Sequence, residues 1–168
     1  GDLGPSLAAL RAATGERRHF LAKALGCSLA WRDGEDLPGI LALLQEGALT
    51  QQDDLGALYE GLGQGIGTWH FQAPAGTLAA VRDQPWEASF LAGLRGSLSW
   101  WFGGSGYAAS ADLILDAVPS RHQAAFLEAL GRWVQESHKG RLHESLSVAV
   151  DELPAPAVEL VLQGICHD

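Results

Sequence analysis

Apolar residues recur at three- and four-residue intervals along most of the chain. In residues 53–66 this spacing places a set of apolar side chains on one side of a helix: Leu55, Leu58, Tyr59, Leu62 and Ile66. Strict alternation of apolar and polar residues, which is typical of a half-buried strand, is scarce. The pattern therefore predicts an all-α fold.

Capping residues, Gly and Pro divide the pattern into about ten helices. The expected helices cover residues 6–14, 16–31, 36–46, 50–66, 77–82, 85–101, 110–118, 120–139, 141–152 and 156–166. Their expected N-caps include Ser6, Asp36, Thr50, Asp83 and Ser110. A capping box is expected between Ser120 and Gln123, and a loop over residues 68–76.

One apolar stripe defines the expected inner side of the helix over residues 16–31. Its members are Phe20, Leu21, Ala24, Leu25, Ser28 and Leu29. The helix over residues 85–101 has a similar stripe that begins at Phe90 and Leu91. We expect both stripes to face a shared core in a single domain that spans residues 1–168.

Two parts of the chain resemble each other at an offset of about 70 residues, and internal repeats indicate stacked units that each cannot bury an apolar face alone. Phe20-Leu21-Ala22 matches Phe90-Leu91-Ala92, and Glu60-Gly61-Leu62-Gly63 nearly matches Glu128-Ala129-Leu130-Gly131. A duplication of residues 16–80 as residues 86–152 predicts two similar halves, arranged as an α-solenoid or a pseudo-twofold helical bundle. Chance similarity between Leu- and Ala-rich helices is the alternative. The signatures of tetratricopeptide and ankyrin repeats are absent.

The charge balance narrows the range of partners. The chain has 168 residues with 11 Lys+Arg, 20 Asp+Glu and a formal net charge of −9. Nucleic acid is a poor partner, because its affinity comes largely from basic groups that neutralise phosphates. No membrane segment is expected, because the apolar runs are shorter than the roughly 18 residues that cross a bilayer. A basic protein is favoured instead, since an acidic surface steers it.

Two residue counts bear on compartment and processing. Cys27 and Cys166 are too few and too far apart for a disulfide framework, which favours a reducing, cytoplasmic compartment. The chain has no Met and begins Gly1-Asp2-Leu3, which indicates a processed or tagged end. Its first residues lack the basic-then-apolar layout of a secretory signal.

Motifs for catalysis or metal binding are incomplete. The glycine run over residues 61–67 does not fit G-x-G-x-x-G and follows no predicted strand, so close helix packing or a frayed helix end is favoured. His138 and His143 lie five residues apart across a break, although Cys166 and His167 offer further ligands. Paired acids such as Asp53 and Asp54 fit helix capping better than acid–base catalysis. No cofactor or metal is expected.

Aromatic residues supply the candidates for a binding site. Adjacent helical residues point about 100° apart, so Trp100 and Trp101 do not both face one core. Trp69 lies at the corresponding end of the other half, and Trp is enriched at binding hot spots. The candidate residues for partner binding are Trp69, His70, Phe71, Trp100, Trp101, Phe102 and Tyr107. Core packing is the competing explanation.

The sequence thus favours a non-enzymatic protein-binding module with an acidic surface, such as an adaptor, a chaperone or an antitoxin-like or immunity-like inhibitor. The alternative is a helical domain that binds a small molecule in an aromatic pocket with His70 or His122. A metal-dependent enzyme is the third hypothesis. A homo-oligomer, in which identical chains pair through the aromatic face, is a further hypothesis.

Overall fold

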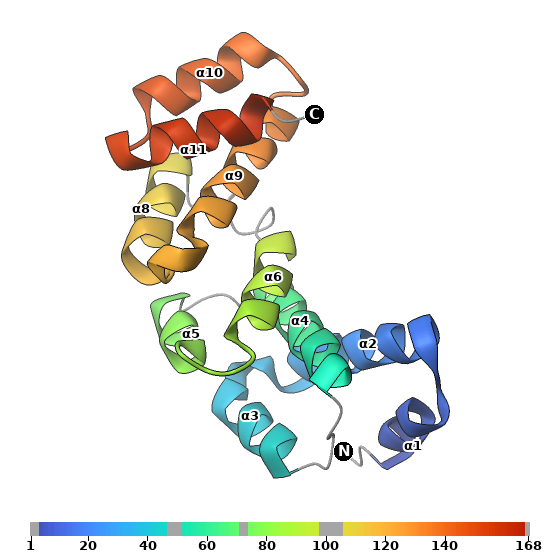
Figure 1. Ribbon diagram of the computed structural model, residues 1–168. Helices are drawn as coiled ribbons and strands as arrows, with labels where there is room; N and C mark the ends of the chain where they lie inside the picture. The colour runs from blue at the N-terminus through green and yellow to red at the C-terminus, as the bar shows by residue number, and fades with distance from the viewer. Residues whose placement is uncertain (1–3, 47–51, 71–73, 98–105, 167–168) are drawn as a thin grey trace. The chain divides into compact units, whose positions relative to one another are not determined.

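The computed structural model describes residues 4–46, 52–70, 74–97 and 106–166, with side chains described throughout except at residues 45, 46, 52 and 53. Within these ranges all regular structure is helical and no strand occurs (Figure 1), which confirms the all-α prediction. None of the described helices is both long and apolar enough to cross a bilayer.

The chain divides into two compact units, Gly1–Ala73 with Ala80–Ser97 and Pro74–Ala79 with Leu98–Asp168. The first unit contains α1 (Gly4–Ala12), α2 (Gly15–Asp33), the 3₁₀ helix η1 (Gly34–Asp36), α3 (Leu37–Glu46), α4 (Gln52–Trp69) and α6 (Glu87–Ser97). The second contains α8 (Tyr107–Ala117), α9 (Ser120–Ser137), α10 (Leu142–Asp151) and α11 (Ala155–Cys166). The residues of α5 (Pro74–Val81) are shared between the units.

Local sequence signals set several of the observed helix ends. Gly15 and Gly140 adopt φ values of +54° and +72°, a conformation that residues with a side chain rarely adopt. The chain turns at both positions. Asp36 caps α3 as predicted, since its Oδ1 accepts a hydrogen bond of 3.0 Å from the backbone N–H of Gly39. The expected cap Thr50 lies outside the described residues.

Other predicted caps are wrong. Ser6 lies within α1, and Ser110 lies in the first turn of α8, where its hydroxyl donates to the Gly106 carbonyl at 2.8 Å. Asp83 has a φ of +61° and its backbone N–H donates to the Glu87 carboxylate. The Ser110 hydroxyl thus bonds back into main chain from inside the helix, which short polar side chains do readily.

The predicted capping box of α9 is also wrong. The helix begins at Ser120 after Pro119, and no side chain bonds at that cap. The side-chain amide of Gln123 instead donates to the carbonyls of Leu115 and Val118, at 2.8 and 2.9 Å. It thereby satisfies carbonyls at the end of α8, which have no partner within that helix.

The loop predicted over residues 68–76 is shorter than expected. Helix α4 continues to Trp69, and α5 begins at Pro74, a residue well suited to the first turn of a helix. The Thr68 hydroxyl donates to the Gln64 carbonyl at 2.8 Å, so it bonds back into its own helix.

The buried side of α2 differs from the predicted stripe. Leu25 and Leu29 are buried as expected, but the side that packs against α4 continues through Ala22, Gly26 and Ala30. Phe20, which was expected in the core, keeps 69% of its surface exposed. Small residues rather than the largest apolar ones define this interface, because α2 approaches α4 too closely for bulky side chains.

Glycines bring the main chains of α2 and α4 together. A Cβ atom built on Gly26 would overlap the carbonyl oxygen of Leu58, and one built on Gly61 would overlap that of Lys23. On each helix the glycine lies three residues after the approached carbonyl, so the contact is reciprocal. This arrangement suits Cα–H···O contacts between helices. We call it a reciprocal glycine crossing.

The same crossing occurs twice more in the described chain. Helix α4 uses its opposite side to cross α6, where Gly63 meets the Phe90 carbonyl and Gly93 meets the Glu60 carbonyl. In the second unit α9 crosses α11 in this way. There Gly131 meets the carbonyl of Val161, and Gly164 meets that of Glu128. The glycine run over residues 61–67 therefore serves close helix packing, one of its two predicted roles.

Candidate functional site

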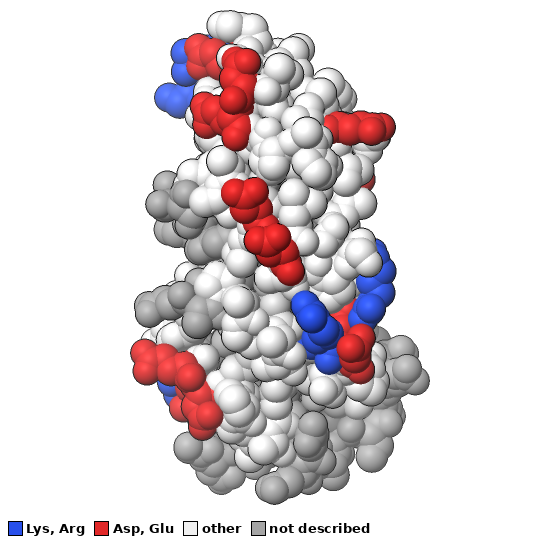
Figure 2. Space-filling model, turned by 90° about the vertical axis from the view of Figure 1, so that its left-hand side faces the viewer, with Lys and Arg blue, Asp and Glu red and all other residues white. Residues whose placement is uncertain are grey.

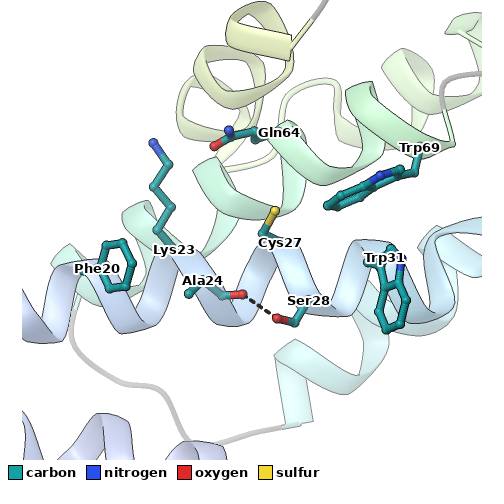
Figure 3. Close-up of a pocket in the computed structure, with 8 residues that line it drawn as sticks. All are labelled: Phe20, Lys23, Ala24, Cys27, Ser28, Trp31, Gln64 and Trp69. Atoms are coloured by element: carbon teal, nitrogen blue, oxygen red, sulfur yellow. Dashed lines mark hydrogen bonds between the residues drawn. The ribbon is translucent and has the colours of Figure 1, made fainter. Parts of the chain in front are cut away.

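An open groove runs along α2 in the first unit (Figure 3). It has a volume of about 540 Å³ and is lined by Phe20, Lys23, Ala24, Cys27, Ser28 and Trp31 of α2 and by Gln64 and Trp69 of α4. Most of these side chains are apolar. The groove thus exposes aromatic surface that a folded monomer would usually bury.

Helical geometry explains how α2 presents this surface. Phe20, Ala24, Cys27 and Trp31 follow one another at four-, three- and four-residue intervals, which places them on one side of the helix. The crossing with α4 occupies the neighbouring side through Gly26. The two apolar sides of α2 therefore serve different purposes, one for packing and one for the groove.

Three aromatic side chains give the groove its character. Phe20, Trp31 and Trp69 are exposed by 69%, 66% and 45% of their surfaces. Trp69 reaches from the end of α4 over the floor of the groove, where a Cβ on Gly65 would lie 3.3 Å from its ring. A larger residue at position 65 would displace this indole. Gly65 therefore shapes the groove as well as the helix contact.

Two cations of α2, Lys23 in the lining of the groove and Arg18 nearby in sequence, are already paired. The Lys23 ammonium lies 2.7 Å from a Glu60 carboxylate oxygen, and Arg18 donates two hydrogen bonds from Nε, at 2.8 and 2.9 Å, to the buried carboxylate of Asp54. The hydrogen bond to Asp54 raises the pKa of Arg18. Asp54 therefore acts as an ion-pair partner of α2, beyond the capping role predicted for it.

Cys27 lies in the floor of the groove with its thiol directed toward α4 (Figure 3). Burial raises the pKa of this thiol, and the nearby Lys23 cation opposes that change in part. Because the thiolate is the nucleophile, a raised pKa lowers reactivity at neutral pH. The other free cysteine, Cys166, is exposed at the end of α11.

We expect iodoacetamide to modify Cys166 before Cys27 at pH 7, since Cys166 is exposed and the Cys27 thiol is partly buried with a raised pKa. Below its pKa, Cys27 should react about 10-fold faster for each unit of increase in pH. Lys23→Gln should slow the reaction of Cys27 further, because it removes the cation that stabilises the thiolate. Peptide mass mapping over time measures both sites in one sample, and faster alkylation of Cys27 than of Cys166 would contradict the expectation.

The structure places the predicted site residues in different surroundings. Trp69 lines the groove, and the His70 ring lies against Gly34 of η1. Tyr107 belongs to the second unit, where its hydroxyl lies 2.9 Å from Ser137 Oγ and its ring centroid 4.9 Å from that of Trp133. The remaining candidates Phe71, Trp100, Trp101 and Phe102 lie outside the described residues.

Sequence reasoning missed Phe20 and Trp31 as groove residues. Their helical spacing with Ala24 and Cys27 was a usable signal, but the same spacing is typical of a core stripe. Ala22, Gly26 and Ala30 provide a second stripe of smaller residues on the same helix. Two competing stripes on one helix indicate that one of them faces something other than the core.

The histidines considered as metal ligands are not gathered in the described chain. His138 Nδ1 lies 2.9 Å from the Val134 carbonyl, and the side chain of His143 is 83% exposed. Among the described residues, no group of three His, Cys, Asp or Glu side chains is placed to hold a metal ion. His167 and Asp168 lie outside those residues.

Charge is distributed over the surface in several separate groups. Figure 2 shows acidic side chains on one face with uncharged surface between them.

No family model, curated protein or solved structure matches this chain.

Proposed function

We propose that the chain is a non-enzymatic protein-binding module whose groove on α2 and α4 receives an apolar segment of a partner. The observation that carries the proposal is the exposure of Phe20, Trp31 and Trp69 together along one groove. Large aromatic side chains in a well-shaped site supply much of the affinity of protein interfaces. The net charge of −9 favours a basic partner.

The form of the groove favours a macromolecule over a small ligand. Small-molecule sites are concave and enclose most of the ligand surface. Here Phe20 and Trp31 each leave about two-thirds of their surface open to solvent, at 69% and 66%. A long segment that lies along α2 would cover both side chains, which are eleven residues apart.

We also propose that the chain is built from two similar halves. A repeat at this offset is supported by equivalent contacts at residues 60–63 and 128–131, since Gly63 crosses α6 and Gly131 crosses α11, a helix that lies beyond the expected second half of residues 86–152. Glu60 and Glu128 provide the approached carbonyls on the same two helices. Repeated helix pairs of this kind are typical of proteins that bind others along an extended surface.

A pull-down from lysate of the source organism tests the binding function. Tagged wild-type chain should retain a basic protein in near-equal amount, and Trp31→Ala should lose it, because the indole is an exposed anchor of the groove. Val150→Ala is the matched control, since Val150 is 63% exposed on α10 in the other unit. High salt should weaken retention by screening.

Circular dichroism of the three proteins should show the same helix content, because both substituted side chains are exposed. Equal retention by wild type and Trp31→Ala would contradict the proposal. Release of a stoichiometric small molecule on denaturation, without any retained protein, would favour the aromatic-pocket alternative instead.

A further inference from the structure

Apart from Trp69, the last residue of α4, the residues that line the groove lie within helices, which limits the conformation that an occupant can take. Residues 20–31 lie within α2 and Gln64 lies within α4, so their main-chain groups bond within those helices. A strand therefore has no edge to join. An extended segment would gain no main-chain hydrogen bond from these helices, because its amides would pair only with water. A helix satisfies its main chain internally.

The length of the groove fits a helix of three to four turns. Phe20 and Trp31 are eleven residues apart on α2, which corresponds to about 16 Å along the helix axis. A partner helix laid along α2 would meet this stretch with apolar residues at positions i, i+4, i+7 and i+11. Such an arrangement is the common mode by which an amphipathic helix occupies a groove.

Charge indicates the character of the occupant's outer side. Three of the four basic residues of α2 already form ion pairs, Arg18 with Asp54, Lys23 with Glu60 and Arg32 with Asp33. The first unit has 7 Lys and Arg against 11 Asp and Glu, a net charge of −4. The unit thus attracts cations, while its own cations beside the groove are neutralised.

We infer that the occupant of the groove is a basic amphipathic α-helix of a partner protein, with an apolar stripe against Phe20, Cys27 and Trp31. This inference rests on the proposed protein-binding function and adds the conformation and charge of the bound segment. Apolar side chains of the partner helix would make the contacts along α2, and the negative charge of the first unit would attract the basic helix at long range.

A labelled 16-residue helical peptide of Leu and Lys, with Leu at i, i+4, i+7 and i+11, tests the inference by fluorescence anisotropy. Two matched peptides accompany it, one with a central Pro that breaks the helix and one with the same composition in scrambled order. The parent peptide should bind at least about 10-fold more tightly than either. Trp31→Ala should weaken its binding by a similar factor, and Val150→Ala should not.

Alkylation of the cysteines gives a second readout on the same samples. The bound parent peptide should protect Cys27 in the groove and leave Cys166 unprotected. Equal binding of the parent and the Pro peptide would contradict the inference that the bound segment is helical. If that binding still depended on Trp31, the groove would remain a protein-binding site.

Two further results would overturn the inference. The first is binding of the parent peptide that is unchanged in Trp31→Ala and leaves Cys27 reactive, which would show charge attraction without groove occupancy. The second is the absence of binding by every peptide. The pull-down with Trp31→Ala decides the broader binding function separately, so the two failures are distinguishable.

Discussion

Replacing Gly93 by Ala is expected to destabilise the protein by about 3 kcal/mol, at the upper end of typical overpacking costs. The added Cβ would overlap the Glu60 carbonyl oxygen and approach the Gln64 backbone nitrogen. Both obstacles are main chain within α4, so neither can move aside as a side-chain tip would. The two helices must separate, and separation weakens the remaining contacts of the crossing.

Gly96→Ala on the same helix is the matched control. Among the described residues, no atom outside the helix's own nearby backbone lies within 4 Å of a Cβ at position 96, so the substitution meets open space there. Since Ala favours helix over Gly, Gly96→Ala should stabilise the protein by up to about 1 kcal/mol. Urea denaturation followed by far-UV circular dichroism measures both variants, and equal effects of the two substitutions would contradict the crossing.

Phe90→Ala should lower the free energy of unfolding by about 3–5 kcal/mol, as expected for loss of a buried aromatic side chain. Phe90 has 0% of its surface exposed and lies at the crossing of α4 and α6. Its ring centroid lies 6.1 Å from that of Trp86, which is stacked on Tyr59 at 4.2 Å. Truncation would leave a cavity in a rigid aromatic cluster.

Phe20→Ala provides a control in an identical local sequence, because both residues begin a Phe-Leu-Ala tripeptide. Phe20 is 69% exposed in the groove, so its removal should change stability by less than about 0.5 kcal/mol. The same denaturation experiment compares the two. A large loss of stability in Phe20→Ala would place Phe20 in the core and remove one wall of the groove.

Periodicity, together with Gly and Pro as helix boundaries, predicted the all-helical class of this chain. In α9 the apolar residues at helical spacing form one buried stripe: Phe126, Leu127, Leu130 and Val134. Trp133, also in that stripe, is half-buried against Tyr107. Such stripes are reliable where large apolar side chains interdigitate, because their periodicity then reports directly on the buried side.

The same method was right for Leu25 and Leu29 of α2 and wrong for Phe20, because close main-chain approach makes much of the interface with α4. Ala22, Gly26 and Ala30 carry little apolar signal, yet they allow α4 to approach closely. Phe20 carries a strong signal and faces the groove. A hydrophobic pattern gives most weight to large apolar side chains. It therefore does not detect the interface of α2 with α4, which depends on small residues or on glycines that have no side chain.

The candidate site was predictable only in part. Trp69 was expected from the enrichment of Trp at binding surfaces, and it lines the groove. Phe20 and Trp31 required knowledge of which side of α2 meets α4, which is a property of tertiary structure. Ser110 and Gln123 were misassigned for a related reason, since their partners, Gly106 for Ser110 and Leu115 and Val118 for Gln123, lie outside the local cap pattern.

The reciprocal crossings also bear on how this fold tolerates evolutionary change. Six positions, Gly26, Gly61, Gly63, Gly93, Gly131 and Gly164, admit no side chain without separating two helices. Around them, buried residues can exchange one aliphatic shape for another at modest cost. We therefore expect any relatives of this chain to keep the spacing of these glycines while the surrounding aliphatic residues change.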